Sequence, residues 1–367
     1  MSFQPKTCFP SLLADSAARL AQDLANNYPQ QPVSSTIGEM GWNALLIPEA
    51  QGGAGGSYTD LVSIIEALAV HVVDLPVITR CGVVPTILMA LSDQPQAKKL
   101  LTACASGEAV LELGGPLSPG EAVQPLLAQP EGQGWRLIGT TAEMPLSKDS
   151  THVLLVCKRA DNGDLLLACV ESGYLRQMAK GFQTMDERHV FVCTLRDMPL
   201  VSDCILASGP TARSALLAGW RVAVAAVATD TVCGMGSALA RTITYLLERR
   251  QFGQSLAHFQ ALRHDVARLY VTYEVSRSLL QASLRVMDTH QQQDEQDAGA
   301  FDLLGLYTSQ EAIEFAETVI QLHGGMGMTR EMPAARLATR LLANATCFGD
   351  PLSHRQSLNR LRTHAKP

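Results

Sequence analysis

Apolar residues recur with a helical period through the first part of the chain. The segments SLLADSAARLAQDLANNY and SYTDLVSIIEALAVHVV place apolar side chains three or four positions apart, which predicts amphipathic helices. Between them lies PEAQGGAGG, where Pro48 and the glycines cannot continue a helix. Such glycines can hold a phosphate, but no preceding strand and no Gly-Lys-Ser/Thr accompany them, so a turn is favoured. Residues 1–107 are expected to form a helical N-terminal domain.

The pattern then changes to short apolar runs separated by polar turns. WRLIGTTAEM, THVLLVCKR, DLLLACVES and HVFVCTLRDM are rich in Val, Leu and Thr, and ADNGD between two of them is typical of a hairpin turn. Residues 108–208 are therefore expected to form a central antiparallel sheet or barrel.

Helical periodicity returns from residue 209 to the end of the chain. ARSALLAGWRVAVAAVATDTVCGMGSALA is strongly apolar, and FQALRHDVARLYVTYEVSRSLL has apolar residues close to a 3.6-residue period. We interpret QQQDEQDAG as a polar loop, and the helix that follows it ends at the paired glycines of QLHGG. Residues 209–367 are predicted to be a helical bundle.

Composition excludes several functional classes. Apolar residues make up 47% of the 367 residues and charged residues 17%, as in globular proteins, and the formal net charge is −6. No basic cluster indicates binding of a nucleic acid or an anionic membrane. The longest apolar stretch contains Arg221 and Asp230, which indicates a buried helix and no membrane span.

The nine cysteines are scattered through apolar surroundings, and no Cys-x-x-Cys pair occurs among them. Zinc sites usually combine closely spaced ligands, and disulfide frameworks belong to short secreted chains. We therefore expect free buried thiols, no metal site and a cytoplasmic location; the N-terminal residues do not have the pattern of a signal peptide.

Three motifs resemble those of the acyl-CoA dehydrogenase family of flavoproteins. They are EMGWNALLIPEAQGGAGGS, ERRQFGQSLAHFQALRHDVARL and QLHGGMGMTREMPAARLATR, and they occur in the family's order. The resemblance covers nearly the whole chain. It implies a mostly α fold with a helical N-domain, a central β-domain and a C-terminal four-helix bundle.

The resemblance also implies an FAD site that is built across a subunit interface, and hence a homodimer, a tetramer or a heteromer. Arg249 would pair with the pyrophosphate, because a guanidinium keeps its charge and offers planar donors. Phe252 would pack on the cofactor and Gln260 would hydrogen-bond to it. Taken alone, the arginine pair at 249–250 would be interpreted as a solvated helix end.

The second motif would complete the cofactor site. Gln321, Gly324 and Gly325 would lie along the phosphate and ribose, because glycines allow the backbone to approach closely and to donate N–H groups. His323 beside them is interpreted as a structural residue.

The implied reaction is α,β-dehydrogenation of an acyl-CoA thioester, with electrons passed to an electron-transferring flavoprotein. The family's usual base is a glutamate, but Gly349 stands at its place and Asp350 follows. A second family position for the glutamate falls near Val224, which carries no acid. Asp350 is the candidate base, and a turn aspartate is the alternative.

Two further departures from the family pattern leave rival functions open. The Phe-Gly-Asp ending resembles a minority branch that includes the small subunit of pimeloyl-CoA dehydrogenase, which implies a catalytically silent partner subunit as one alternative. An enzyme that uses oxygen as its acceptor is another. In the central region, only Glu112 and Ser118 remain of the family's flavin-contacting segments, so fewer flavin contacts are expected.

Overall fold

The computed structural model describes residues 3–27, 35–117, 124–289 and 295–364. Contacts between residues divide the chain into two compact units. One unit comprises residues 1–31, 62–74 and 224–367, and the other comprises residues 32–61 and 75–223. Ser118 lies outside the described residues. The division into three domains at residues 107 and 208 stays a prediction.

Short helices fill the N-terminal region, as the periodicity predicts. The first, α1, is capped by Ser11, whose hydroxyl accepts the N–H of Ala14 at 3.2 Å. The α-helices here are α1 (Leu12–Asn26), α2 (Thr36–Glu39), α3 (Tyr58–Ala69), α4 (Val84–Ala90) and α5 (Pro95–Ser106). Single turns of 3₁₀ helix occur at Trp42–Ala44 and Glu49–Gln51, and a π-helix spans Ile78–Val83.

The central region folds into a sheet, which confirms the strand prediction. Its strands are β1 (Leu111–Leu113), β2 (Leu126–Glu131), β3 (Gly134–Thr140), β4 (His152–Arg159), β5 (Leu165–Glu171), β6 (Ala179–Gln183), β7 (His189–Leu200) and β8 (Ile205–Ser208). Helix α6 (Ser172–Arg176) and a 3₁₀ turn at Ser202–Cys204 lie between strands. The order along the sheet is β6-β7-β3-β2-β4-β5-β8, with β1 beside β4.

The sheet is mixed, so the expectation of purely antiparallel pairing was wrong. Strands β4 and β5 do form the antiparallel hairpin predicted around ADNGD. However, β1 and β2 both run parallel to β4. The parallel β2–β4 pair arises because the chain leaves β3, passes over β2 and returns at β4, which is a crossover connection.

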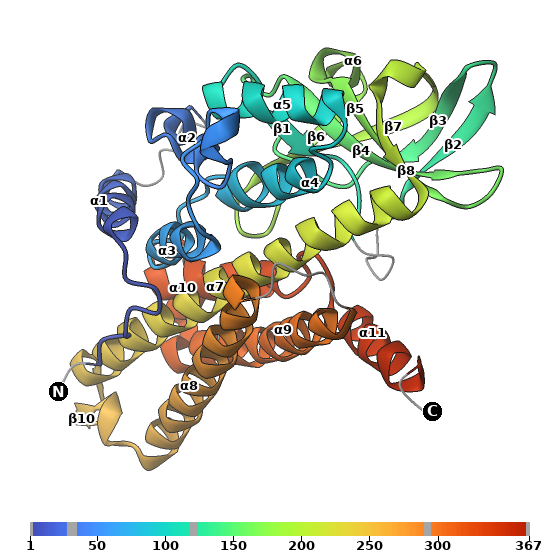
Figure 1. Cartoon of the computed structure of the whole chain (residues 1–367). Helices are drawn as coiled ribbons and strands as arrows, with labels where there is room; N and C mark the ends of the chain where they lie inside the picture. Colours follow the sequence, from blue (N-terminus) through green and yellow to red (C-terminus); the bar gives the residue numbers. More distant parts are fainter. Residues whose placement is uncertain (1–2, 28–34, 118–123, 290–294, 365–367) are drawn as a thin grey trace. The chain divides into compact units, whose positions relative to one another are not determined.

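The C-terminal region is helical, as predicted. Its helices are α7 (Gly209–Glu248), α8 (Gln260–Thr289), α9 (Glu295–His323), α10 (Pro333–Asn344) and α11 (Pro351–His364). Helix α9 packs against α8, α10 and α11 (Figure 1). The predicted apolar face of α8 is buried at Leu269, Tyr273 and Leu280. The expected loop at 291–299 was wrong in part, because α9 begins at Glu295: its polar residues include no glycine or proline before Gly299 to prevent a helix.

Helix α7 contributes residues to both units. By length and composition α7 could cross a membrane, but all residues of its most apolar 18-residue stretch are buried inside the protein. Its buried aspartate is paired within the protein. Asp230 is buried and accepts hydrogen bonds from Arg340 Nη2 at 2.9 Å and from Asn344 Nδ2 at 2.8 Å, both on α10.

Seven of the nine cysteines are buried, as the apolar surroundings predict. Burial raises the pKa of Cys104 and Cys157 to about 12. These thiols therefore stay protonated and chemically quiet at neutral pH.

The Asp230–Arg340 pair yields a stability prediction. Asp230→Ala removes the carboxylate closest to the buried Arg340 guanidinium and leaves the longer contact with Asp74 Oδ1 at 4.0 Å. Removal of one member of a buried ion pair costs about 3–5 kcal/mol, so the variant should be clearly less stable. Arg268→Ala removes an arginine whose side chain is 80% exposed, and is expected to change stability by less than about 0.5 kcal/mol. Chemical denaturation of both variants checks this, and equal stabilities would contradict it.

Candidate functional site

The arginine motif forms a tight hairpin directly after α7. Strands β9 (Arg250–Gln251) and β10 (Gln254–Ser255) pair across a two-residue turn. Phe252 and Gly253 form that turn with φ of +51° and +82°. Arg249 lies at its base, where its N–H donates to Tyr245 O at 2.8 Å and its carbonyl accepts the Leu256 N–H at 2.9 Å.

The functional groups of this hairpin are exposed. The Phe252 side chain is 88% exposed and contacts Phe259 edge-to-face, with ring centroids 6.1 Å apart. Arg249 and Gln260 are also exposed, and Gln260 is the first residue of α8. A cation, an amide and an uncovered aromatic ring are therefore available to a ligand on one short segment.

The glycine motif lies where α9 ends. A 3₁₀ turn spans Gly324–Met328, and Gln321, Gly324 and Gly325 are exposed. Gly324 has φ of +56°, and a Cβ placed on Gly324 or Gly325 would meet nothing within 4 Å. The backbone here is open to close approach by a ligand.

Tyr245 and His323 join the two motifs. Their rings stack with centroids 4.5 Å apart, and Tyr245 Oη donates to His323 O at 3.3 Å. Tyr245 lies one helical turn before Arg249, and His323 immediately precedes Gly324. The structure thus brings together two segments that are far apart in the sequence. Tyr245 was not predicted as a site residue; its only signal in the sequence is its spacing of four residues from Arg249, which places both on one side of a helix.

His323 is buried, which agrees with a structural role. Its Nδ1 bonds Val319 O at 2.9 Å, and burial lowers the pKa of its ring. Its Nε2 has no hydrogen-bond partner among the described residues. The ring is therefore held neutral against Tyr245, at the base of the glycine turn.

The residues of this site fit an anionic dinucleotide. Arg249 supplies a permanent cation with planar donors, Gln260 and Gln321 supply amides, and open space lies beside Gly324 and Gly325. The roles assigned to the individual residues stay predictions.

Asp350 caps α11. Its Oδ1 accepts the N–H of Ser353 at 2.7 Å, and its carbonyl accepts the Ser353 hydroxyl at 2.8 Å. Pro351 begins the helix, as is common at that position. Asp350 is partly exposed, and its Oδ2 has no hydrogen-bond partner among the described residues.

The residue before Asp350 must be a glycine. Gly349 has φ of +135°, and a Cβ there would lie 2.7 Å from His354 Nε2. His354 is buried and fixed, because its Nδ1 contacts Asp302 Oδ1 at 3.2 Å while Asp302 Oδ2 accepts the Ser357 hydroxyl at 2.5 Å. A glutamate at position 349 does not fit this structure.

The other positions at which the sequence could place the catalytic base have no carboxylate that is free to accept a proton. Val224 is a buried valine, and Asp230 is engaged by Arg340. Glu112 is fully buried, and its Oε1 accepts hydrogen bonds from Arg80 Nε at 3.0 Å and from Ser150 Oγ at 2.6 Å. Glu112 therefore serves an internal ion pair.

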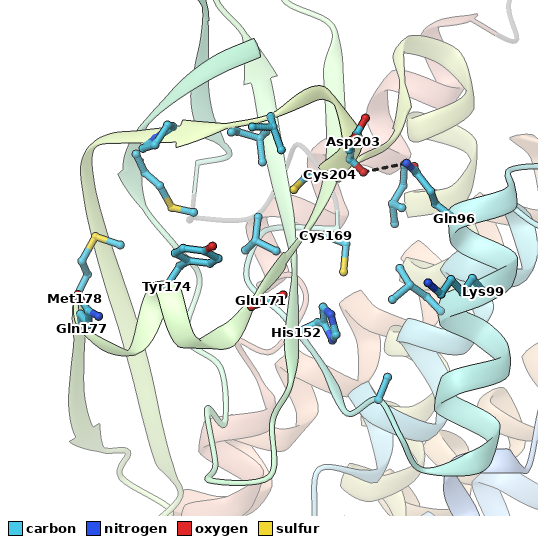
Figure 2. Close-up of a pocket in the computed structure, with 18 of the residues that line it drawn as sticks. Gln96, Lys99, His152, Cys169, Glu171, Tyr174, Gln177, Met178, Asp203 and Cys204 are labelled. Carbon is cyan, nitrogen blue, oxygen red and sulfur yellow. Dashed lines mark hydrogen bonds between the residues drawn. The ribbon is translucent and has the colours of Figure 1, made fainter. Parts of the chain in front are cut away.

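A separate pocket of 1320 Å³ lies between α5 and the sheet (Figure 2). Gln96 and Lys99 face it from α5, while Glu171 and Tyr174 face it from the strand side, and Gln96 Nε2 donates to Asp203 O at 2.9 Å. Its lining contains both signs of charge and none of the predicted site residues. It indicates no particular ligand class.

Two regions of the chain match models of one family. Residues 11–108 match the description Acyl-CoA dehydrogenase, N-terminal domain, and residues 208–360 match Acyl-CoA dehydrogenase, C-terminal domain. The acyl-CoA dehydrogenase FadE28 of Mycobacterium tuberculosis is 27% identical over 320 residues, which cover 87% of this chain and 88% of that protein.

Solved structures share the fold. The ChsE4-ChsE5 complex from Mycobacterium tuberculosis contains a chain that is 17% identical, with a TM-score of 0.78 and coverage of 99% of this chain and 100% of that chain. The Tcur3481-Tcur3483 steroid ACAD is 24% identical, with a TM-score of 0.77 and coverage of 96% and 97%. The chain belongs to the acyl-CoA dehydrogenase family of FAD-dependent oxidoreductases.

Proposed function

We propose that this protein catalyses α,β-dehydrogenation of an acyl-CoA thioester and passes the electrons to an electron-transferring flavoprotein. The observation that carries the proposal is the contact of Tyr245 with His323, which places the Arg249 hairpin beside the Gln321–Gly325 turn. FAD, when bound, supplies the acceptor for the substrate hydride. Arg249, Gln260 and Gln321 would hold it through hydrogen bonds, with Gly324 and Gly325 against its phosphates and Phe252 packed on it.

Asp350 is proposed as the base that removes the α-proton. Its Oδ1 is occupied by the Ser353 N–H, so the side chain has a fixed orientation, while Oδ2 stays available for a proton. The loop before Asp350 is further restricted at Gly349, which packs against the His354 ring that is held by Asp302. A base must be held in place before it can be effective.

Exposed apolar side chains support an oligomer. Val271 and Val275 on α8 are 59% and 44% exposed, on the side away from the buried face of that helix. Phe252 is more exposed still. Apolar groups that gather on one helix face commonly mark an interface, so we propose a homodimer, a tetramer or a heteromer in which FAD lies between subunits.

A catalytically silent partner subunit is the second candidate. It is favoured by the capping role of Asp350 and by the steric exclusion of a glutamate at position 349. The ChsE4-ChsE5 complex contains two different subunits, and the Phe-Gly-Asp ending resembles the branch with the pimeloyl-CoA dehydrogenase small subunit. In this function the chain would complete the FAD site of a related subunit in the cytoplasm.

Anaerobic spectroscopy of the purified, FAD-loaded protein tests the proposed function. We expect one member of a panel of fatty and steroid side-chain acyl-CoA thioesters to bleach the oxidised flavin band. A band that stays oxidised with every thioester would favour the silent partner. Slow reoxidation in air, accelerated by an electron-transferring flavoprotein, would support the dehydrogenase, and rapid reoxidation in air alone would indicate an oxidase.

Substitution of Asp350 separates its capping role from its role as a base. Asp350→Asn keeps an oxygen that accepts the Ser353 N–H but removes the carboxylate, so the rate of flavin reduction should fall roughly 10²- to 10⁴-fold with unchanged stability. Asp350→Ala should lose the same activity and also about 1 kcal/mol of stability. Wild-type reduction by Asp350→Asn would exclude Asp350 as the base.

Arg249→Ala tests the cofactor site. Hydrogen bonds to charged groups contribute about 1.5–3 kcal/mol, so its loss should weaken FAD binding about ten- to hundredfold. Arg268→Ala on α8 is the matched exposed control and should bind FAD normally. Equal FAD dissociation constants for the two variants, measured by fluorescence titration of the apoprotein, would contradict the assignment.

A further inference from the structure

Two cysteines that are far apart in the sequence meet inside the protein beside a buried glutamate. Cys8 lies in the extended segment before α1, Glu66 on α3 and Cys233 on α7, and all three are buried. Their sulfur and carboxylate oxygen atoms lie within 4.8 Å of one another. Spacing rules could not reveal this cluster, because each donor comes from a different element.

The N-terminal segment is held in this place by its backbone. Glu66 Oε1 accepts the N–H of Cys8 at 2.7 Å, and Oε2 accepts the N–H of Phe9 at 2.9 Å. Three residues before Cys8, Pro5 packs so closely on Gly236 of α7 that a Cβ on Gly236 would lie 2.9 Å from Pro5 Cβ. These contacts fix both the Glu66 carboxylate and the backbone that carries the Cys8 thiol.

The carboxylate keeps capacity to bind a cation. Each of its oxygens accepts one N–H, and an ionised carboxylate offers about four lone-pair sites. These N–H groups orient Glu66 in the way that outer partners orient metal ligands. A tetrahedral zinc ion with Zn–S bonds of about 2.3 Å needs sulfur atoms roughly 3.8 Å apart, and the sulfur atoms of Cys8 and Cys233 lie within 4.8 Å of each other.

A pocket gives the cluster an approach from solvent. It has a volume of 640 Å³, and its lining includes Glu66, Cys233, Ser63, Lys6 and His71. Lys6 is exposed. The pocket provides a path for an ion and a place for a water molecule as fourth ligand.

We propose that Cys8, Glu66 and Cys233 form a binding site for a thiophilic divalent cation of the zinc class, with water in the fourth position. On binding, the two S–H bonds break, two sulfur–metal bonds form and two protons leave to solvent, with no change of oxidation state. The ion ties the N-terminal segment to α3 and α7. The site is independent of the FAD site and of the proposed dehydrogenase activity.

Cobalt titration of the chelator-treated, reduced full-length protein tests the site. We expect one Co²⁺ per chain, with the intense visible bands of tetrahedral cobalt and a sulfur-to-metal charge-transfer band, read as difference spectra against the cobalt-free flavoprotein. Zn²⁺ should displace the cobalt and raise the melting temperature.

Variants assign the ligands. Cys8→Ser and Cys233→Ser should each weaken Co²⁺ binding by at least about 100-fold. Mutating a residue that only hydrogen-bonds to a metal ligand already lowers metal affinity about 10- to 100-fold, and loss of a ligand should cost at least as much. Cys104→Ser removes a buried thiol elsewhere and should bind as wild type. Unchanged cobalt spectra in Cys233→Ser, or no tetrahedral cobalt in the wild type, would overturn the proposal. The proposal would also be overturned if the reduced protein bound no cobalt and oxidation formed a disulfide between Cys8 and Cys233.

Discussion

The need to bury an apolar helix of 40 residues governs much of this structure. A helix that is apolar on all sides must be covered on all sides. Ile87 of α4 packs directly on Gly219 of α7, where an added Cβ would lie only 2.6 Å from Ile87 Cγ1. The one aspartate in the interior of α7, Asp230, is paired with Arg340. The same helix carries Tyr245 and ends directly before Arg249. The end of this buried helix therefore determines the position of Arg249, the residue proposed to bind the pyrophosphate of FAD.

The sequence predicted those elements whose pattern is complete within a single segment. Helices with a long apolar period and strands such as β4 and β5 are of this kind. The short strands β1 and β8 and the π-helix at Ile78–Val83 were not predicted, because a few residues carry no measurable period. The parallel pairing of β2 with β4 depends on the path of the chain, and hydrophobic alternation does not specify strand direction.

The same limit applies to the candidate site. The arginine and glycine motifs are local, so the sequence identified both. The stacking of Tyr245 on His323 joins them across two helices, and no single segment contains that information. The cluster of Cys8, Glu66 and Cys233 was not predicted either, because rules based on ligand spacing recognise only sites whose ligands are close together in the sequence.

The geometry around Gly349 restricts how this chain obtains a base. The φ of +135° at Gly349 and the fixed His354 ring exclude a glutamate at this position. To accommodate one, the protein would have to move His354 out of its hydrogen bond with Asp302. Among the described residues at the positions considered, Val224 carries no acid and Asp230 is neutralised by Arg340. For the proposed dehydrogenation, Oδ2 of Asp350 is the proposed acceptor of the α-proton, and a carboxylate supplied by another subunit is the alternative. Because Oδ1 is bound to the Ser353 N–H, Asp350 cannot turn toward substrate without uncapping α11. A dehydrogenase that uses Asp350 must bring its substrate to that carboxylate, and the substrate pocket is then arranged around the start of α11.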